Sequence, residues 1–412
     1  MTSTRQTTDS AVAEPAVDAV HMARALELAA RALYTTDPNP RVGCVLVRDG
    51  RVIGEGWHER AGQPHAEVLA LRAAGAGEAR GATAYVTLEP CSHTGRTPPC
   101  ADALLAAGIS RVVCASVDPN PKVAGGGIAR LEAHGICVSV GLLAEQAREL
   151  NAGFFSRFER GRPFVRLKLA MSLDARTTAA GGGRHWITGE AARADVQTWR
   201  ARSSAVLTGA GTVRTDDPRL DVRLDYGPWI RQPLRVVLDP ELSCNAGSRV
   251  FAEGNALIFA AADARRDAGA DSRSGADMRA HAAARAAAGA DVGGMAGVES
   301  PAGPETLGRI KVMRVPRSPR GLDLPTVLDR LTALDVNELL VECGPRLAAA
   351  FLEAGLVDEL ILYVAPTFLG ADAAPLADLR GLGAAEALLR FEFRDQRLIQ
   401  NDLRLVLTPK RA

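Results

Sequence analysis

The chain has 412 residues, of which 47% are hydrophobic and 24% are charged, and its formal net charge at pH 7 is +1. This near-neutral composition provides no general attraction to nucleic acids or anionic membranes, and no apolar stretch is long enough to cross a bilayer. The length favours two domains, and an odd set of seven cysteines without an apolar N-terminal signal core predicts a reducing, cytoplasmic location.

The first part of the chain alternates segments of helix and strand character. Residues 1–15 are expected to form a disordered tail, and Asp49-Gly50 predicts a tight hairpin. The elements predicted here are the helices Val17–Leu33, His65–Ala74, Pro99–Ala107, one from Ile128 and a connecting helix Leu142–Arg160, and the strands Val42–Val47, Arg51–Gly56, Ala82–Leu88, Arg111–Val117 and Cys137–Val140. Such alternation predicts a layered α/β domain over residues 16–160.

A second α/β domain is predicted over residues 161–412, with a low-complexity insertion at 262–303 that is rich in alanine, glycine, aspartate and arginine. The predicted elements are the strands Phe164–Met171, Ser204–Thr208, Arg235–Leu238, Ala256–Ala261 and Leu339–Cys343, the helices Glu190–Arg202, Pro325–Leu334 and Pro345–Ala354, and late strands Phe391–Asp395 and Leu403–Leu407.

The clearest chemical signal is a set of metal-ligand side chains at strand-to-helix junctions of the first domain. His65, Cys91 and Cys100 supply one imidazole and two thiolates, which leave one position of a tetrahedral zinc open for water. Glu67, two residues after His65, can carry protons between that water and a leaving group. This is the pattern of zinc nucleobase deaminases, except that eight residues separate the two cysteines instead of two. Other histidines, such as His58, lack ligand spacing and are expected to be structural.

The second domain gives weaker signals when taken alone. Gly209-Ala210-Gly211-Thr212 follows a strand but lacks the third glycine of a dinucleotide-binding fingerprint. Glu342-Cys343-Gly344-Pro345 ends a strand and opens a helix, which suits either a bound phosphate or a plain turn.

Several motifs resemble the bifunctional deaminase–reductase family of riboflavin biosynthesis, and the long spacer between the two cysteines is typical of that family. The motifs are Met22–Leu26, Pro38–Cys44, Pro64–Glu67, Thr87–Cys100, Lys168–Asp174, His185–Thr188, Thr212–Pro218, Glu342–Pro345, Gly355–Leu360 and Ala365-Pro366. The resemblance implies a cytidine-deaminase-like three-layer α/β/α domain followed by a dihydrofolate-reductase-like α/β domain. It further implies hydrolytic deamination of 2,5-diamino-6-(5-phosphoribosylamino)pyrimidin-4-one and then NADPH-dependent reduction of the ribosyl side chain.

The same resemblance assigns roles to individual residues. One Zn²⁺ per deaminase domain would be held by His65, Cys91 and Cys100, with Glu67 as the catalytic proton carrier. Substrate residues of the deaminase would be Asn39, His93, Arg96, Thr97, Asp118 and Asn120. NADPH would contact Ala170, Trp186, Thr212, Asp216, Gly344, Pro345 and Arg346. Substrate residues of the reductase would be Lys168, Arg184, Arg200, Leu220, Arg223 and Glu342.

Two departures from the family pattern are Ala175, where glycine is usual, and the insertion at 262–303.

The expected partner is a small phosphorylated pyrimidine, with no nucleic acid and no membrane, and the protein is expected to form a homo-oligomer, a dimer or tetramer. A second hypothesis keeps the deaminase but makes the C-terminal half a non-catalytic binding or oligomerisation module. A third, a deaminase of nucleic-acid bases, is disfavoured because the chain is neutral and has no basic run with interleaved aromatic residues.

Overall fold

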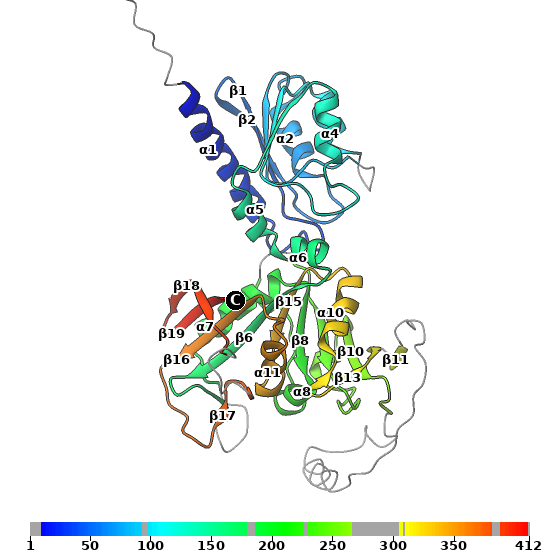
Figure 1. The fold of residues 1–412 in the computed structure, drawn as a ribbon, viewed down its shortest axis with the longest axis vertical. Helices are drawn as coiled ribbons and strands as arrows, with labels where there is room; N and C mark the ends of the chain where they lie inside the picture. The colour runs from blue at the N-terminus through cyan, green and yellow to red at the C-terminus, as the bar shows by residue number, and fades with distance from the viewer. Residues whose placement is uncertain are drawn as a thin grey trace, which may run out of the picture.

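The computed structural model describes residues 10–92, 98–178, 186–225, 227, 229–265, 305–307, 310–380 and 388–410. They form two α/β units, with the shorter sheet above the longer one and helices α5 (Ala144–Leu150) and α6 (Ala152–Arg160) where the units meet (Figure 1). No helix among these residues is both long and apolar enough to cross a membrane.

The N-terminal unit is a three-layer sandwich around a five-stranded sheet of order β2-β1-β3-β4-β5. Its strands are β1 (Gly43–Arg48), β2 (Arg51–Trp57), β3 (Thr83–Val86), β4 (Arg111–Cys114) and β5 (Cys137–Val140), and its helices are α1 (Ser10–Ala30), α2 (Ala66–Ala74), α3 (Cys100–Ala106) and α4 (Gly126–Ala133). Side chains alternate across β1: Cys44 and Leu46 pack in the cluster that holds α2, α3 and α4, whereas Val45 and Val47 pack with α1. The predicted α/β/α layering is confirmed.

Close packing of α1 on β1 depends on one glycine. A Cβ atom at Gly43 would lie 1.9 Å from the backbone oxygen of Ala25, so any larger residue would push the helix off the sheet. The predicted hairpin is also confirmed, because Arg48 pairs with Arg51 and both Asp49 and Gly50 have positive φ, as a two-residue turn requires.

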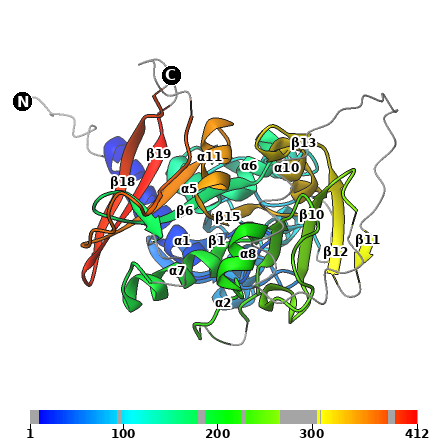
Figure 2. The same cartoon turned by 90° about the horizontal axis from the view of Figure 1, so that it is seen from below.

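The C-terminal unit is built on a ten-stranded sheet of order β11-β12-β10-β9-β8-β15-β6-β16-β19-β18. Its strands are β6 (Phe164–Ser172), β8 (Ala205–Gly209), β9 (Leu234–Leu238), β10 (Ala256–Ala261), β11 (Glu305–Leu307), β12 (Ile310–Val315), β15 (Glu338–Glu342), β16 (Glu359–Ala365), β18 (Phe391–Ile399) and β19 (Asp402–Pro409). From β12 to β16 the strands are parallel, and β11, β19 and β18 pair antiparallel at the two edges (Figure 2).

Helices and short strands complete the C-terminal unit. They are α7 (Glu190–Arg202), α8 (Ala210–Asp216), α10 (Leu324–Ala333), α11 (Pro345–Glu353), the 3-10 helix Arg249–Phe251, and the two-residue or three-residue strands β7 (Arg176–Thr178), β13 (Arg317–Ser318), β14 (Gly321–Leu322) and β17 (Ala374–Pro375). Ala175, the departure from glycine noted above, has a φ of 55° in the tight turn between β6 and β7. That left-handed conformation explains why glycine is favoured at this position.

Three expectations need correction or fall outside the described chain. Helix α1 begins at Ser10, so residues 10–15 are helical and are not a disordered tail, and alanines at 11 and 13 favour this extension. The single connecting helix expected over Leu142–Arg160 is two helices, because the backbone breaks at Asn151, whose side-chain amide bonds both the N–H and the carbonyl of Arg41. Residues 1–9 of the tail and 266–303 of the insertion lie outside the described residues.

Candidate active sites

The three predicted metal ligands come together at the carboxyl side of β3 and the starts of α2 and α3. The Nδ1 atom of His65 lies 3.2 Å from Sγ of Cys100 and 3.6 Å from Sγ of Cys91. Ligand atoms about 3.5–3.8 Å apart are what tetrahedral zinc with Zn–N near 2.0 Å and Zn–S near 2.3 Å requires. Among the described residues, these three are the group of histidine, cysteine and acidic side chains that could hold a metal ion, and their donor set fits zinc.

Electrostatics around the thiols favour metal binding. Hydrogen bonds with Cys100, and a further one with His65, lower the pKa of Cys91, because they stabilise its thiolate. The backbone N–H of Cys100, in the first turn of α3, also donates to Sγ of Cys91 over 3.3 Å.

Glu67 lies beside the metal ligands in the first turn of α2 and is buried. Burial raises the pKa of Glu67 to about 7, because the charged carboxylate loses its hydration. Its Oε2 atom is buried and makes no hydrogen bond within the described part of the chain. A carboxyl group with a pKa near neutral and one free oxygen suits a group that accepts and returns protons.

A cavity of about 460 Å³ opens in front of Glu67 and two of the metal ligands. Asn39 and His58 form one wall, and the Nδ2 atom of Asn39 lies 3.1 Å from Nε2 of His58. Since Nδ1 of His58 can donate to the carbonyl of Pro64 over 3.2 Å, Nε2 is free to accept from Asn39. His58 is therefore one of the residues that line the pocket, which its sequence context did not indicate.

Asp118 and Asn120 also line this cavity. They are held there by Glu89, which the sequence analysis missed. Its buried carboxylate accepts the N–H groups of Asp118, Gly125, Gly127 and Ile128 over 2.9–3.2 Å and so fixes the turn that leads into α4. Burial raises the pKa of Asp118 to about 6. The other predicted substrate residues of the deaminase, His93, Arg96 and Thr97, lie outside the described residues.

A second polar cluster lies at the carboxyl ends of the central strands of the larger sheet. Lys168 on β6 is the direct neighbour of Glu342 on β15, and Glu342 accepts two hydrogen bonds from Arg200 of α7, over 2.5 and 2.9 Å. Burial lowers the pKa of Lys168, although the negative charge of Glu342 opposes this effect. A lysine and an arginine around one carboxylate suit binding of an anionic, hydroxyl-rich ligand.

Leu220 and Arg223 join this cluster through Arg200. The Nη1 atom of Arg200 donates to the backbone carbonyl of Asp221 over 3.1 Å, and Arg223 pairs with the carboxylate of Asp221. Leu220 is buried next to them in the chain and has a φ of 58°. Arg184 lies outside the described residues.

Six of the seven residues predicted to contact a nucleotide cofactor lie at the same edge of the sheet. Ala170 lies near the end of β6, and Thr212 and Asp216 lie in α8, which begins directly after β8. Gly344, Pro345 and Arg346 open helix α11 directly after β15. Parallel strands β8, β15 and β6 bring these segments together at their carboxyl ends, where ligands bind in such sheets. Trp186 is exposed and packs under the guanidinium of Arg193, whose Cζ lies 4.9 Å from the ring centre.

Two protein-family models match the chain. Residues 15–116 match the cytidine and deoxycytidylate deaminase zinc-binding region, and residues 163–405 match the RibD C-terminal domain. The first match covers β1 to β4 and the three metal ligands with Glu67, and the second covers the larger sheet up to the middle of β19 and its polar cluster.

Relatives match nearly the whole chain. The riboflavin biosynthesis protein RibD of Escherichia coli is 45% identical over 95% of this chain and 99% of its own length, and that of Haemophilus influenzae is 42% identical over 95% and 98%. The structure of RibD from Acinetobacter baumannii matches with a TM-score of 0.80, 40% identity and coverage of 96% of this chain and 100% of that one. A Thermotoga maritima diaminohydroxyphosphoribosylaminopyrimidine deaminase/5-amino-6-(5-phosphoribosylamino)uracil reductase matches with a TM-score of 0.77, 30% identity and coverage of 96% and 100%.

Proposed function

Because the chain belongs to the RibD family of riboflavin-biosynthesis proteins, we propose that it is a bifunctional enzyme whose two domains catalyse consecutive steps. The first domain deaminates 2,5-diamino-6-(5-phosphoribosylamino)pyrimidin-4-one, and the second reduces the ribosyl side chain to give 5-amino-6-(5-phosphoribitylamino)uracil. The observation that supports this proposal most strongly is the buried carboxyl of Glu67 beside the His65, Cys91 and Cys100 cluster, at the end of a cavity large enough for a pyrimidine nucleotide.

In the deaminase, His65, Cys91 and Cys100 hold zinc, which supplies Lewis-acid activation of water when it is bound. Asn39 and His58 bind the polar edge of the pyrimidine, and Asp118 and Asn120 contact the ribose phosphate side. Glu67 takes a proton from the attacking water and delivers it to the ring nitrogen. It then takes the second proton from the hydroxyl group added to the ring carbon and gives it to the amino group, which leaves as ammonia while the carbonyl forms. The burial of Glu67 keeps bulk water away from these transfers.

Removal of the metal should separate the two activities. A chelator should abolish ammonia release, whereas reduction of the already deaminated substrate should be unchanged, because the three ligands belong to the first domain only. Added Zn²⁺ should restore deamination in proportion to the metal bound, measured by atomic absorption. Deamination that persists in metal-free protein would contradict the assignment.

In the reductase, NADPH supplies the hydride, and the chain supplies binding and orientation. Ala170, Trp186, Thr212 and Asp216, with the start of α11 at Gly344, Pro345 and Arg346, surround the cofactor. Lys168, Glu342, Arg200, Leu220 and Arg223 face the phosphosugar, with Arg184 as a further contact. The two hydrogen bonds from Arg200 hold the carboxylate of Glu342 in place, so that it can orient the sugar hydroxyls. Lys168, on the neighbouring strand, donates hydrogen bonds to the same phosphosugar.

Lys168→Met should lower kcat/KM of the reductase about 10- to 150-fold, the value of one charged hydrogen bond, and leave deamination unchanged. The measurement is NADPH oxidation at 340 nm (roughly its absorption maximum) with the deaminated substrate. Lys311→Met is the matched control, because Lys311 is exposed on β12 at the far side of the sheet. Equal effects of the two substitutions would refute the assigned role of Lys168.

The order of the two steps tests the whole proposal. Ammonia should be released from the diaminopyrimidine without NADPH, and NADPH should be consumed only after deamination. If NADPH neither binds nor is oxidised, the C-terminal half is a non-catalytic module. Deamination of tRNA or single-stranded DNA would instead favour the nucleic-acid hypothesis.

Assembly and location extend the proposal. Edge strand β18 carries the exposed side chains Phe393 and Leu398, which supports a homo-oligomer formed through this strand. None of the seven cysteines forms a disulfide, which supports a reducing cytoplasmic location. Light scattering of the purified protein tests the first inference.

A further inference from the structure

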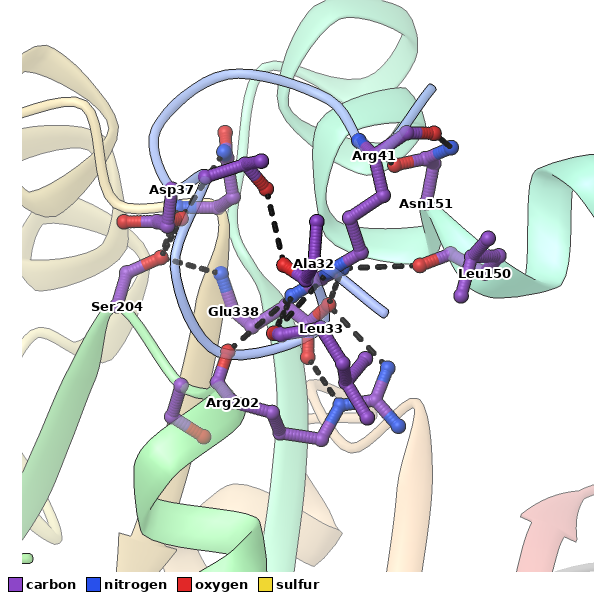
Figure 3. A network of polar contacts seen from close by, with 12 residues as sticks. Ala32, Leu33, Asp37, Arg41, Leu150, Asn151, Arg202, Ser204 and Glu338 are labelled. Carbon is purple, nitrogen blue, oxygen red and sulfur yellow. Dashed lines mark hydrogen bonds and ion pairs between the residues drawn. The ribbon is translucent and has the colours of Figure 1, made fainter. Parts of the chain in front are cut away.

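The loop between α1 and β1 carries Asn39 into the deaminase pocket, yet much of what holds it belongs to the reductase domain. Pro38, Asn39 and Pro40 line the pocket. On either side of them, Asp37 bonds to Ser204 and Arg41 bonds to Glu338, both of which belong to the unit with the larger sheet (Figure 3). The loop is therefore held at two points that flank the residues in the pocket.

The first anchor is Asp37. Its Oδ1 atom accepts hydrogen bonds from Oγ of Ser204 over 2.7 Å and from Nδ2 of Asn337 over 3.2 Å. Nδ2 of Asn337 also donates to the backbone carbonyl of Pro38 over 2.8 Å. Arg231 pairs with the other oxygen of Asp37. Ser204, Asn337 and Arg231 all belong to the reductase domain.

The second anchor is Arg41, which is almost fully buried between the domains. Its Nη1 atom donates to Oε1 of Glu338 over 2.8 Å and to the carbonyl of Leu150 over 2.9 Å. Glu338 is the first residue of β15, is 1% exposed, and also accepts from Arg166 and Arg202. Asn151, at the break between α5 and α6, clamps the backbone of Arg41 from the other side.

Asn39 has little freedom between these anchors. Prolines on both sides restrict its backbone, and its own N–H donates to the carbonyl of Thr36 over 2.9 Å. A shift of Asp37 or Arg41 would therefore move the Asn39 amide relative to His58 and to the pyrimidine. A misplacement of about 1 Å is enough to weaken productive binding.

We propose that Ser204, Asn337 and Glu338 of the reductase domain are positioning residues for deamination, acting through Asp37 and Arg41 to hold the Asn39 loop in the deaminase pocket. This inference rests on the proposed contact of Asn39 with the pyrimidine. It makes the deaminase pocket dependent on one end of β15, whose other end carries Glu342 of the reductase site.

The test is a double-mutant cycle on the full-length, zinc-loaded enzyme, with ammonia release measured without NADPH. Asn337→Ala should raise KM for the diaminopyrimidine roughly 5- to 10-fold, the effect of one or two lost hydrogen bonds, with kcat changed less than about twofold. Zinc content and reduction of the deaminated substrate should not change. Ser204→Ala, which removes the hydrogen bond from Ser204 to Asp37, should raise KM in the same way. It replaces Asn337→Ala in the test if that variant does not fold.

Asn39→Ala combined with Asn337→Ala should be no worse than Asn39→Ala alone, because the second substitution acts only through the first residue. Arg160→Gln is the matched control: it breaks an ion pair between α6 and Asp358 of the reductase domain without touching the loop, and KM should not move. Multiplicative effects in the double variant, or an unchanged KM in both Asn337→Ala and Ser204→Ala, would overturn the proposal. If instead Asn39→Ala leaves KM unchanged, the assigned pyrimidine contact is wrong. In that case KM of Asn337→Ala and Ser204→Ala alone decides whether the reductase domain positions the loop.

Discussion

Glu67→Gln should reduce the rate of deamination about 10²- to 10⁴-fold while the protein still binds one zinc per chain. The amide has nearly the same shape as the carboxyl group, so the packing of α2 against the sheet is kept. The amide cannot accept and return a proton. The carboxyl group of Glu67 is suited to that task because burial raises its pKa to about 7. The measurement is ammonia release at saturating substrate, with metal content determined on the same sample.

Two comparisons separate a proton-transfer role from general damage to the site. Reduction of the deaminated substrate by the same variant should stay at the wild-type rate. Glu78→Gln makes the same change on an exposed carboxylate that pairs with Arg48, and it should leave deamination intact. A Glu67→Gln enzyme that keeps a tenth or more of its activity would refute the proton-carrier assignment, whereas loss of zinc together with activity would make Glu67 a support of the metal site.

The metal site could be predicted from the sequence because its signal is local. His65 and Glu67 lie two residues apart at one helix start, and only eight residues separate Cys91 from Cys100, so short spacings already encode much of the geometry. Most strands of the two sheets were predictable for a similar reason, since they are short apolar runs between turn residues. Strands β11 and β12 and the central strand β16 were not among the predicted strands. Residues such as His58 and Glu89 escaped prediction because their roles depend on what they face, Asn39 in one case and the turn into α4 in the other.

The contacts between the domains could not be predicted at all. Arg41 and Glu338 are 297 positions apart in the sequence. Arginine is also so common in this chain that no single arginine stands out. The break at Asn151 depends on the same interface, because an asparagine in the middle of a helical pattern shows no sign that its side chain is bonded to another segment. Sequence patterns show periodicity and local chemistry, whereas the roles of these residues depend on partners that are distant in the sequence.

Glu338→Gln should have the largest effect on stability of any single substitution considered, a loss of about 3–5 kcal/mol in the free energy of unfolding. Glu338 is the one carboxylate shared by Arg41, Arg166 and Arg202, all of them mostly buried. Its replacement by a neutral amide removes the counter-charge of Arg41 and Arg202 and leaves Arg166 with Glu359 alone, in a place where water cannot replace the lost charge. Urea unfolding followed by tryptophan fluorescence measures the loss. Glu159→Gln, which breaks the half-exposed ion pair with Arg148, should cost less than about 1 kcal/mol.

The difference between wild type and Glu338→Gln should also depend on pH in a defined direction. Burial alone would raise the pKa of Glu338, but the charges of Arg166, Arg202 and Arg41 outweigh it and hold the pKa well below the ordinary value of 4.5. A carboxyl group with a lowered pKa in the folded protein stabilises it fully above the unfolded value and loses that contribution as the pH falls through the folded value. The stability difference should therefore be constant from neutral pH down to about one unit above the unfolded value, shrink steadily below 4.5, and vanish only in strong acid. A difference that grew with acidification, or that disappeared near neutral pH, would show that Glu338 is not the charged centre of the interface.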